Sequence, residues 1–358
     1  MSATICSGLT GARIEKSAVA GAVLMQKILV AGPSWVGDMV MAQSLYQALQ
    51  QRHPGVVIDV LAPAWSGPII QRMAEVRRHI EMPLGHGTLG LKQRYRLGKQ
   101  LRAEGYDQAI ITPRSFKSAL TPFFAHIPRR TGYTGEQRYG LINDRRQLDK
   151  TVLTQTVQRY VALGLEREAV LPPEISYPSL TIDVDNQQRL LQTLGLSLEQ
   201  PVVGFMPAAE YGPAKRWPPD YFAALAQQLV AQGKQVWLFG SAKDQPLCDE
   251  IAGSAGDGVV NLAGRTQLGD VVDLIALTDL VVSNDSGLMH IAAATGRKIV
   301  AIYGSSSPSY TPPLTDKATV LYLNLECSPC FKRECPLGHY RCLREIDVSY
   351  VLEKAGPF

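Results

Sequence analysis

The segment GPSWVGD, residues 32–38, joins a glycine-containing turn to a carboxylate. It follows the apolar run KILVA and has the glycine spacing of a phosphate-binding loop, but Asp38 stands where such a loop carries lysine. A carboxylate at this place repels phosphate, whereas it can accept a proton from a reacting hydroxyl. From the residues alone, helix capping is the favoured interpretation of Asp38, and a general base is the alternative.

Two later segments carry the residue types that bind anions. In MPAAEYGPAKRWPPDYF, residues 206–222, Lys215 and Arg216 come just before a predicted helix, and cations there suit a diphosphate. In VVSNDSGLMHIAAATG, residues 281–296, a strand ends at Asp285, Ser286 and Gly287 before a second helix. The glycine allows close approach of a ligand to free backbone N–H groups. Together the two loops predict a nucleotide-diphosphate site.

Three further side chains have two interpretations each. Asp285 can accept hydrogen bonds from sugar hydroxyls, or it can cap the helix. His290 lies one turn inside that helix and is either a ligand contact or a buried core histidine. Asp244 follows the strand VWLFG and is a candidate ribose ligand.

Positive charge is concentrated in the first half of the chain. Residues 92–150 contain 13 Lys/Arg against 5 Asp/Glu, although the whole chain has a net charge of only +4. Arg114, Lys117, Arg129 and Arg130 fall in predicted loops beside strand ends, where ligands of α/β sheets bind. The pattern predicts an anionic partner, and no nucleic-acid-binding signature accompanies it.

Apolar runs alternate with helical segments, which predicts an α/β protein with two parallel sheets. No apolar run reaches the length of a membrane span, and six cysteines in 358 residues do not form a disulfide scaffold, so we expect a cytoplasmic protein. The predicted strands are residues 27–31, 56–62, 79–83, 107–112 and 129–133, then 201–207, 235–240, 259–264, 279–285 and 298–304. The predicted organisation is an extension (1–24, with a signal peptide as the alternative), a first Rossmann-like domain (25–170), a proline-rich linker (171–186), a second Rossmann-like domain (187–346) and a C-terminal stub (347–358).

The motifs GPSWVGDMVMAQSL, PAAEYGPAKRWP, NDSGLMHIAAA and CSPCFKRECPLGHYRC carry a family resemblance. From residue 25 onward the chain resembles the ADP-heptose:lipopolysaccharide heptosyltransferases of glycosyltransferase family 9, and the type II enzymes most. The resemblance implies a GT-B fold, in which two Rossmann-like domains with parallel sheets face a cleft. The acceptor then binds the first domain, and the nucleotide sugar binds the second.

The same resemblance implies a reaction. It is the metal-independent, inverting transfer of L-glycero-D-manno-heptose from ADP-heptose to heptosyl-Kdo2-lipid A, without a cofactor, by an enzyme peripheral to the cytoplasmic face of the inner membrane. Asp38 would be the base, kept ionised by the helix N-terminus, and Lys215 with Arg216 would neutralise the departing ADP. Ser286 and Gly287 would donate hydrogen bonds to the phosphates.

The remaining implied roles concern the sugar and the acceptor. Asp285 and His290 would contact the donor. Arg114, Lys117, Arg129 and Arg130 would meet the carboxylates and phosphates of the acceptor. The alternatives are a heptosyltransferase acting at another core position, another nucleotide-sugar transferase or epimerase, and a non-catalytic nucleotide-binding regulator.

Two motifs suggest a metal. Asp183-Val184-Asp185 matches the D-x-D of another glycosyltransferase fold, but its place before a helix favours capping. The thiols of Cys327, Cys330, Cys335 and Cys342, with His339 among them, allow zinc, a disulfide or free packed thiols. The last helix, residues 349–355, is shorter than the one that crosses back to the first domain in GT-B proteins.

Overall fold

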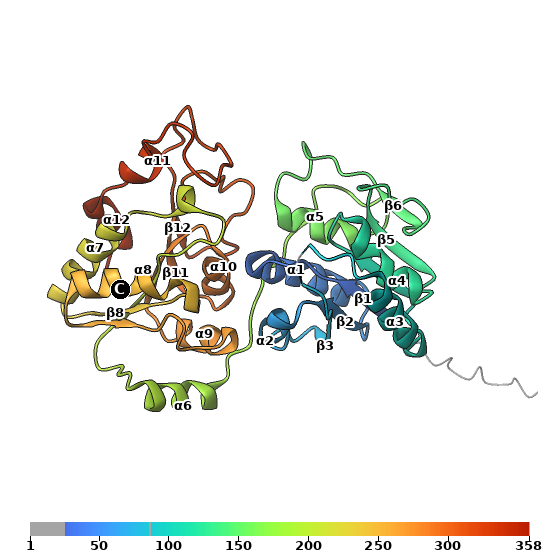
Figure 1. Cartoon of the computed structure of the whole chain (residues 1–358), viewed down its shortest axis with the longest axis horizontal. Helices are drawn as coiled ribbons and strands as arrows, with labels where there is room; N and C mark the ends of the chain where they lie inside the picture. The colour runs from blue at the N-terminus through green and yellow to red at the C-terminus, as the bar shows by residue number, and fades with distance from the viewer. Residues whose placement is uncertain (1–25, 86, 358) are drawn as a thin grey trace, which may run out of the picture.

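A computed structural model describes residues 26–85 and 87–357. The predicted extension, residues 1–24, lies outside the described part. The chain forms two α/β domains side by side, each built on a parallel six-stranded sheet (Figure 1). Among the described helices, none is long and apolar enough to cross a membrane.

The first domain has the strand order β3-β2-β1-β4-β5-β6. Its central strands β1, β2 and β4 are almost wholly apolar and buried, as expected of a sheet covered on both faces. The strands are β1 (Lys27–Ala31), β2 (Val57–Ala62), β3 (Val76–Glu81), β4 (Gln108–Ile111), β5 (Arg129–Tyr133) and β6 (Asp144–Arg146), and the helices are α1 (Val36–Arg52), α2 (Gly67–Ile70), α3 (Leu91–Leu101), α4 (Leu120–Phe124) and α5 (Thr156–Leu163).

The second domain repeats this plan with the order β12-β11-β10-β7-β8-β9. Its strands are β7 (Val202–Met206), β8 (Gln235–Leu238), β9 (Val259–Asn261), β10 (Leu280–Asn284), β11 (Lys298–Ile302) and β12 (Ala318–Leu321). Its helices are α6 (Val184–Leu194), α7 (Pro219–Ala231), α8 (Gln245–Ala255), α9 (Leu268–Ile275), α10 (Gly287–Ala294), α11 (Arg341–Arg344) and α12 (Val348–Ala355). The final helix α12 packs on α7 and β11 of its own domain.

Strand order reverses between β1 and β4 in the first sheet and between β10 and β7 in the second. Open α/β sheets bind ligands outside the carboxyl ends of strands at such points. The loop after β1 leads into α1 with Asp38, and the loop after β10 leads into α10 with Gly287. Topology therefore directs both candidate loops toward ligand-binding edges.

Helices α1 and α10 pack against each other where the two domains meet (Figure 1). Two glycines allow this close approach. A Cβ atom added at Gly37 would lie 2.6 Å from Cδ2 of His290, and one added at Gly287 would lie 2.7 Å from Cβ of Val36. Side chains at either position would hold the helices apart.

A second contact between the domains centres on Asp273 of α9, whose side chain is fully buried. Its carboxylate accepts hydrogen bonds from Arg72 of the first domain at 2.5 Å, from the backbone N–H of Asp183 at 2.9 Å and from Asn186 Nδ2 at 2.7 Å. One carboxylate thus joins the first domain, the segment between the domains and the second domain.

Candidate active site

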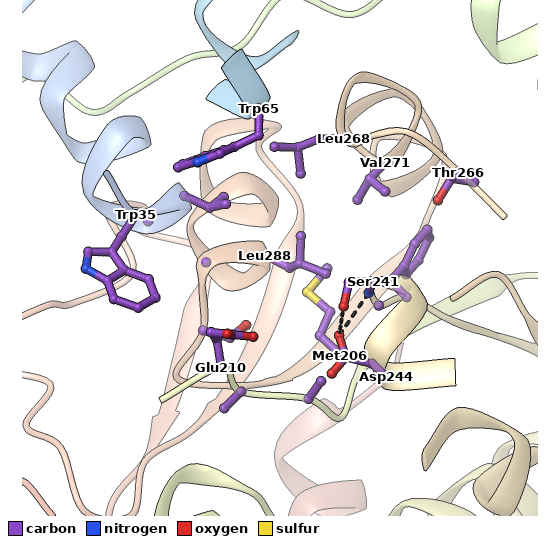
Figure 2. Close-up of a pocket in the computed structure, with 18 of the residues that line it drawn as sticks. Trp35, Trp65, Met206, Glu210, Ser241, Asp244, Thr266, Leu268, Val271 and Leu288 are labelled. Carbon is purple, nitrogen blue, oxygen red and sulfur yellow. Dashed lines mark hydrogen bonds between the residues drawn. The ribbon is translucent and has the colours of Figure 1, made fainter. Parts of the chain in front are cut away.

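A cavity of about 450 Å³ opens at the carboxyl edge of the second sheet (Figure 2). Its wall from the second domain is largely apolar, with Met206, Leu268 and Val271, and its polar groups include Ser241 and Asp244. Trp35 and Trp65 close it from the first domain. An apolar cavity with a few polar groups suits a nucleotide base and ribose.

The N-terminus of α10 forms part of the same wall. Ser286 is the N-cap residue and Gly287 the first helical residue, and both line the cavity. The first N–H groups of a helix have no partner within the helix, and they carry the positive end of its dipole. This part of the wall is therefore suited to a phosphate group.

Asp244 lies in the cavity wall, but it also stabilises its own turn. Its Oδ2 accepts hydrogen bonds from the backbone N–H of Ser241 at 2.9 Å and from its hydroxyl at 2.7 Å (Figure 2). Its assignment as a ribose ligand stays a prediction.

Lys215 and Asp285 form an ion pair beside the α10 N-terminus. Lys215 Nζ donates to Asp285 Oδ2 at 2.5 Å, and the Asp285 carboxylate is almost fully buried. Ser306 donates to the same oxygen at 2.5 Å, and the Lys215 ammonium lies 5.3 Å from the centre of the Tyr211 ring. Asp285 therefore orients the lysine, a role that its prediction as a sugar ligand did not include.

Arg216 points back onto its own loop. Its guanidinium donates two hydrogen bonds to the carbonyl oxygen of Ala209, at 3.3 and 3.2 Å. Lys215, Arg216, Asp285 and His290 are not among the residues that line the 450 Å³ cavity, whereas Asp244, Ser286 and Gly287 are. Arg216 holds the shape of the loop, and Lys215 is the cation next to Asp38.

Asp38 occupies the first turn of α1, which begins at Val36. Tyr160 of α5 donates a hydrogen bond to Asp38 Oδ1 at 2.7 Å. Burial raises the pKa of Asp38 above its ordinary value; the Tyr160 hydrogen bond and the charge of Lys215 lower it, and the charge of Asp285 raises it further. We expected the helix N-terminus to keep Asp38 ionised; burial, the largest influence on its pKa, acts in the opposite direction.

A second cavity, of about 580 Å³, opens on the first-domain side of Asp38. Arg114 and Lys117 line it, as the charge pattern predicted, and Trp35 and Trp65 line both cavities. Asp38 thus lies in the wall of a basic cavity at its junction with the nucleotide-type cavity. This is where a base must lie to act on an acceptor hydroxyl close to a bound donor.

Arg129 and Arg130 do not reach this cavity, and their assignment to loops beside the ligand-binding edge is wrong. They begin β5, so they lie at the amino edge of the parallel sheet, opposite the ligand-binding edge. Arg129 pairs with Asp144 and Glu166, and Arg130 donates to the carbonyl oxygen of Leu141 at 2.7 Å. Both arginines brace the fold around β6.

His290 is buried beneath Gly37, at the α1–α10 contact. Burial lowers the pKa of His290 to about 4, so the imidazole is neutral near pH 7. The structure places it as a packing element between the domains. A donor contact for it stays a prediction.

The two candidate metal motifs have other roles in the described part of the chain. Asp183 caps α6 and accepts from the backbone N–H of Asn186 at 3.0 Å, which confirms the capping interpretation. The four C-terminal cysteines are free thiols around a small cavity of about 20 Å³ that they share with His339. No group of His, Cys, Asp or Glu within residues 26–85 and 87–357 is arranged to hold a metal ion.

Tyr160, Trp35 and Trp65 were not selected in the sequence analysis. Tyr160 is a tyrosine on an ordinary helix, far from Asp38 in the chain, so only the packing of α5 on α1 brings them together. Trp35 belongs to the motif GPSWVGD. An indole in a glycine turn is a signal that could have marked it as part of a cavity wall.

Comparison with known proteins agrees with this geometry. Residues 94–341 match the family described as glycosyltransferase family 9 (heptosyltransferase). The chain belongs to this family. It is 49% identical to lipopolysaccharide heptosyltransferase 2 of Salmonella typhimurium, over 92% of this chain and 97% of that one. It is also 49% identical to lipooligosaccharide heptosyltransferase 2 of Haemophilus influenzae, over 91% and 97%.

The fold agrees with a solved family member. The structure of Escherichia coli ADP-heptose LPS heptosyltransferase II superposes with a TM-score of 0.82 at 46% identity, covering 92% of this chain and 97% of that one. The family member described here is therefore a glycosyltransferase with the GT-B fold, as the motifs implied. Its two parallel sheets are the two Rossmann-like halves of that fold.

Proposed function

We propose that this glycosyltransferase transfers L-glycero-D-manno-heptose from ADP-heptose to heptosyl-Kdo2-lipid A, adding the second heptose with inversion. The observation that carries the proposal is the position of Asp38. It lines the basic cavity of the first domain, close enough to Lys215 and Asp285 of the second for their charges to shift its pKa. The relatives named lipopolysaccharide and lipooligosaccharide heptosyltransferase 2 support a heptose as the sugar and a lipopolysaccharide-type acceptor.

The reaction needs a proton acceptor and a stabilised leaving group. The Asp38 carboxylate takes the proton of the acceptor hydroxyl as that oxygen attacks the anomeric carbon. The bond from this carbon to the phosphate oxygen breaks, and ADP leaves with the electron pair. A base with a raised pKa suits proton transfer near neutral pH.

Lys215 and the α10 N-terminus would stabilise the departing ADP. Asp285 and Ser306 hold the lysine in place before substrate binds, so its ammonium needs little reorganisation during the reaction. The N–H groups of Ser286 and Gly287 add donors from the cavity wall. In this arrangement the chain supplies charge stabilisation from its own side chains and backbone.

The acceptor carries carboxylates and phosphates on a lipid, and the first domain has a surface that fits both. Arg114 and Lys117 line the acceptor cavity. The large apolar side chains of Leu89, Leu91 and Tyr95 are exposed at the start of α3, among basic residues of the same helix. Apolar and basic side chains together favour the surface of an anionic membrane, which supports peripheral contact with the cytoplasmic face of the inner membrane.

Product analysis tests the proposal. The purified protein is incubated with ADP-heptose and heptosyl-Kdo2-lipid A, and the products are analysed by mass spectrometry and by NMR of the new linkage. We expect one added heptose, linked with inverted anomeric configuration, and stoichiometric ADP. Transfer only to unheptosylated Kdo2-lipid A, or to a more complete core, would identify a different acceptor position. ADP-heptose that stays unconsumed with every acceptor would refute the proposal.

A further inference from the structure

Helix α5 of the first domain contacts both the candidate base and the second domain through neighbouring residues. Tyr160 donates to Asp38 Oδ1 at 2.7 Å. Arg159, the residue before it, donates from Nη1 to the hydroxyl of Tyr310 in the second domain at 2.9 Å. Its guanidinium carbon lies 4.7 Å from the centre of the Tyr310 ring. The backbone N–H of Thr156, the first residue of α5, donates to the carbonyl oxygen of Tyr310 at 3.0 Å.

Apolar packing reinforces this contact. Leu314, from the same second-domain loop as Tyr310, is buried in a cluster with Met41 of α1 and with Val157 and Val161 of α5. The side chain of Arg159 is itself braced, because it donates to the carbonyl oxygens of Leu153 and Thr154. The orientation of α5 therefore depends on where the second-domain loop lies.

The other end of that loop contacts the donor side of the site. Ser306, four residues before Tyr310, donates to Asp285, which holds Lys215. The Tyr310 ring also packs edge-on against Phe331, whose carbonyl oxygen accepts from the hydroxyl of Tyr211 at 2.7 Å. Tyr211 in turn lies under the Lys215 ammonium. At one end this loop contacts Asp285, the partner of Lys215, and at the other end it contacts α5, which carries Tyr160.

We propose that residues 304–314 act as a latch between the domains, and that Tyr310 and Tyr160 are positioning residues for Asp38. When the second domain is in place, Tyr310 holds α5 so that the Tyr160 hydroxyl fixes the orientation of the Asp38 carboxylate. The position of the second domain thereby determines the orientation of the Asp38 carboxylate. The inference rests on the proposed function of Asp38.

The charged groups around Asp38 make the effect of the latch measurable in the pH dependence of kcat. Tyr160 faces it from α5, and Lys215 and Asp285 face it from the second domain. His290 packs beneath the neighbouring Gly37 and is neutral near pH 7. The cavity that Asp38 lines also contains Arg94, Arg114, Lys117 and Glu136. Because the Tyr160 hydrogen bond lowers the pKa of Asp38, its loss must move the acid limb of the kcat profile to higher pH.

The test compares Tyr160→Phe, Tyr310→Ala and the double variant with Tyr350→Ala as the matched control. Tyr350 is 37% exposed, against 39% for Tyr310, and it also packs under a cation, Lys354, but it lies on α12. We expect kcat to fall about tenfold to a hundredfold in each single latch variant, as a small displacement of a catalytic group does. ADP affinity should stay unchanged, and the control should match wild type.

Two readouts separate positioning from a general loss of structure. In the double variant, kcat should fall little further than in Tyr160→Phe alone, because Tyr310 acts through Tyr160. The acid limb of kcat should move to higher pH in both single variants. Additive losses, an unmoved limb, or kcat in Tyr310→Ala equal to that of the control would overturn the proposal.

Two further measurements keep the test decisive. Tyr310→Phe retains the ring and loses only the hydroxyl that Arg159 binds, so it replaces Tyr310→Ala if that variant does not fold. The titration of the Asp38 carboxyl carbon by NMR in the ADP complex reports the latch without turnover, and we expect a raised pKa in both latch variants. A wild-type protein that transfers no heptose would refute the proposed function. If the wild type transfers heptose but the pKa of Asp38 in the latch variants equals that in the wild type, the latch alone is refuted.

Discussion

Replacing Asp38 by Asn separates the catalytic role of this carboxylate from its structural role. The amide keeps an oxygen that can accept the Tyr160 hydrogen bond, so the contact at 2.7 Å can survive. It removes the proton acceptor. General base catalysis contributes about 10²–10⁴ in rate, which corresponds to about 2.7–5.4 kcal/mol in the activation free energy. We expect this loss to appear in kcat, with ADP affinity close to that of wild type.

The melting temperature of the same variant should be equal to or higher than that of wild type. Burial raises the pKa of Asp38 in the folded protein, so the folded state holds the proton more tightly than the unfolded state. The stability that this site contributes is present below the unfolded pKa and is lost as pH rises through the folded pKa. At neutral pH the ionised carboxylate therefore disfavours folding, and Asp38→Asn should melt at the same temperature as wild type or higher.

Single-turnover kinetics with saturating ADP-heptose, combined with thermal unfolding between pH 5 and pH 8, measures both quantities. Asn caps a helix about as well as Asp, so a purely structural Asp38 would leave both stability and turnover of this variant near wild type. Turnover of folded Asp38→Asn within about threefold of wild type would refute the base assignment. A melting temperature clearly below wild type at pH 8 would refute the argument from burial.

Three further experiments test the rest of the site. Lys215→Ala should raise the Kd of ADP by about 10- to 150-fold in calorimetry, the effect of losing a charge-assisted hydrogen bond, and an unchanged Kd would place the diphosphate elsewhere. Arg114→Ala combined with Lys117→Ala should raise the acceptor KM at constant ADP affinity, and a lower ADP affinity with an unchanged acceptor KM would contradict the acceptor cavity. Gly37→Ala places a methyl group against His290 of α10 and should lower kcat by up to about a hundredfold. Gly253→Ala is the control, because a Cβ there meets nothing within 4 Å. Equal activities of the two variants would show that the α1–α10 contact tolerates displacement.

The central strands could be predicted from sequence because burial on both faces demands unbroken apolar runs. β1 and β5 have the predicted bounds, and the runs at β7, β8, β10 and β11 each contain the observed strand. The edge strands β6 and β12 were not predicted. β6 is only Asp144–Arg146, a charged segment whose strand geometry comes from pairing with β5 and from ion pairs around Asp144 rather than from an apolar pattern.

The site was predictable in its motifs and not in its contacts. Glycine turns at strand ends identified Asp38 and Gly287, since topology brings such turns to one edge of a sheet. Charge alone assigned Arg129 and Arg130 to the ligand-binding edge, although they begin the predicted strand 129–133 and so lie at the amino end of β5. The Tyr160–Asp38 hydrogen bond depends on how α5 packs on α1, and no local pattern in the sequence encodes that angle.

The buried carboxylate of Asp273 has a consequence for how the two domains are held together. Arg72, the backbone of Asp183 and the side chain of Asn186 all converge on it. Of these partners Arg72 comes from the first domain, so separating the domains would break its ion pair and leave the Asp273 carboxylate buried without this cation. Since the carboxylate is fully buried, dissolved salt screens its attraction to Arg72 weakly. The alignment of Asp38 with the cavity of the second domain therefore depends in part on an ion pair that high salt should weaken little.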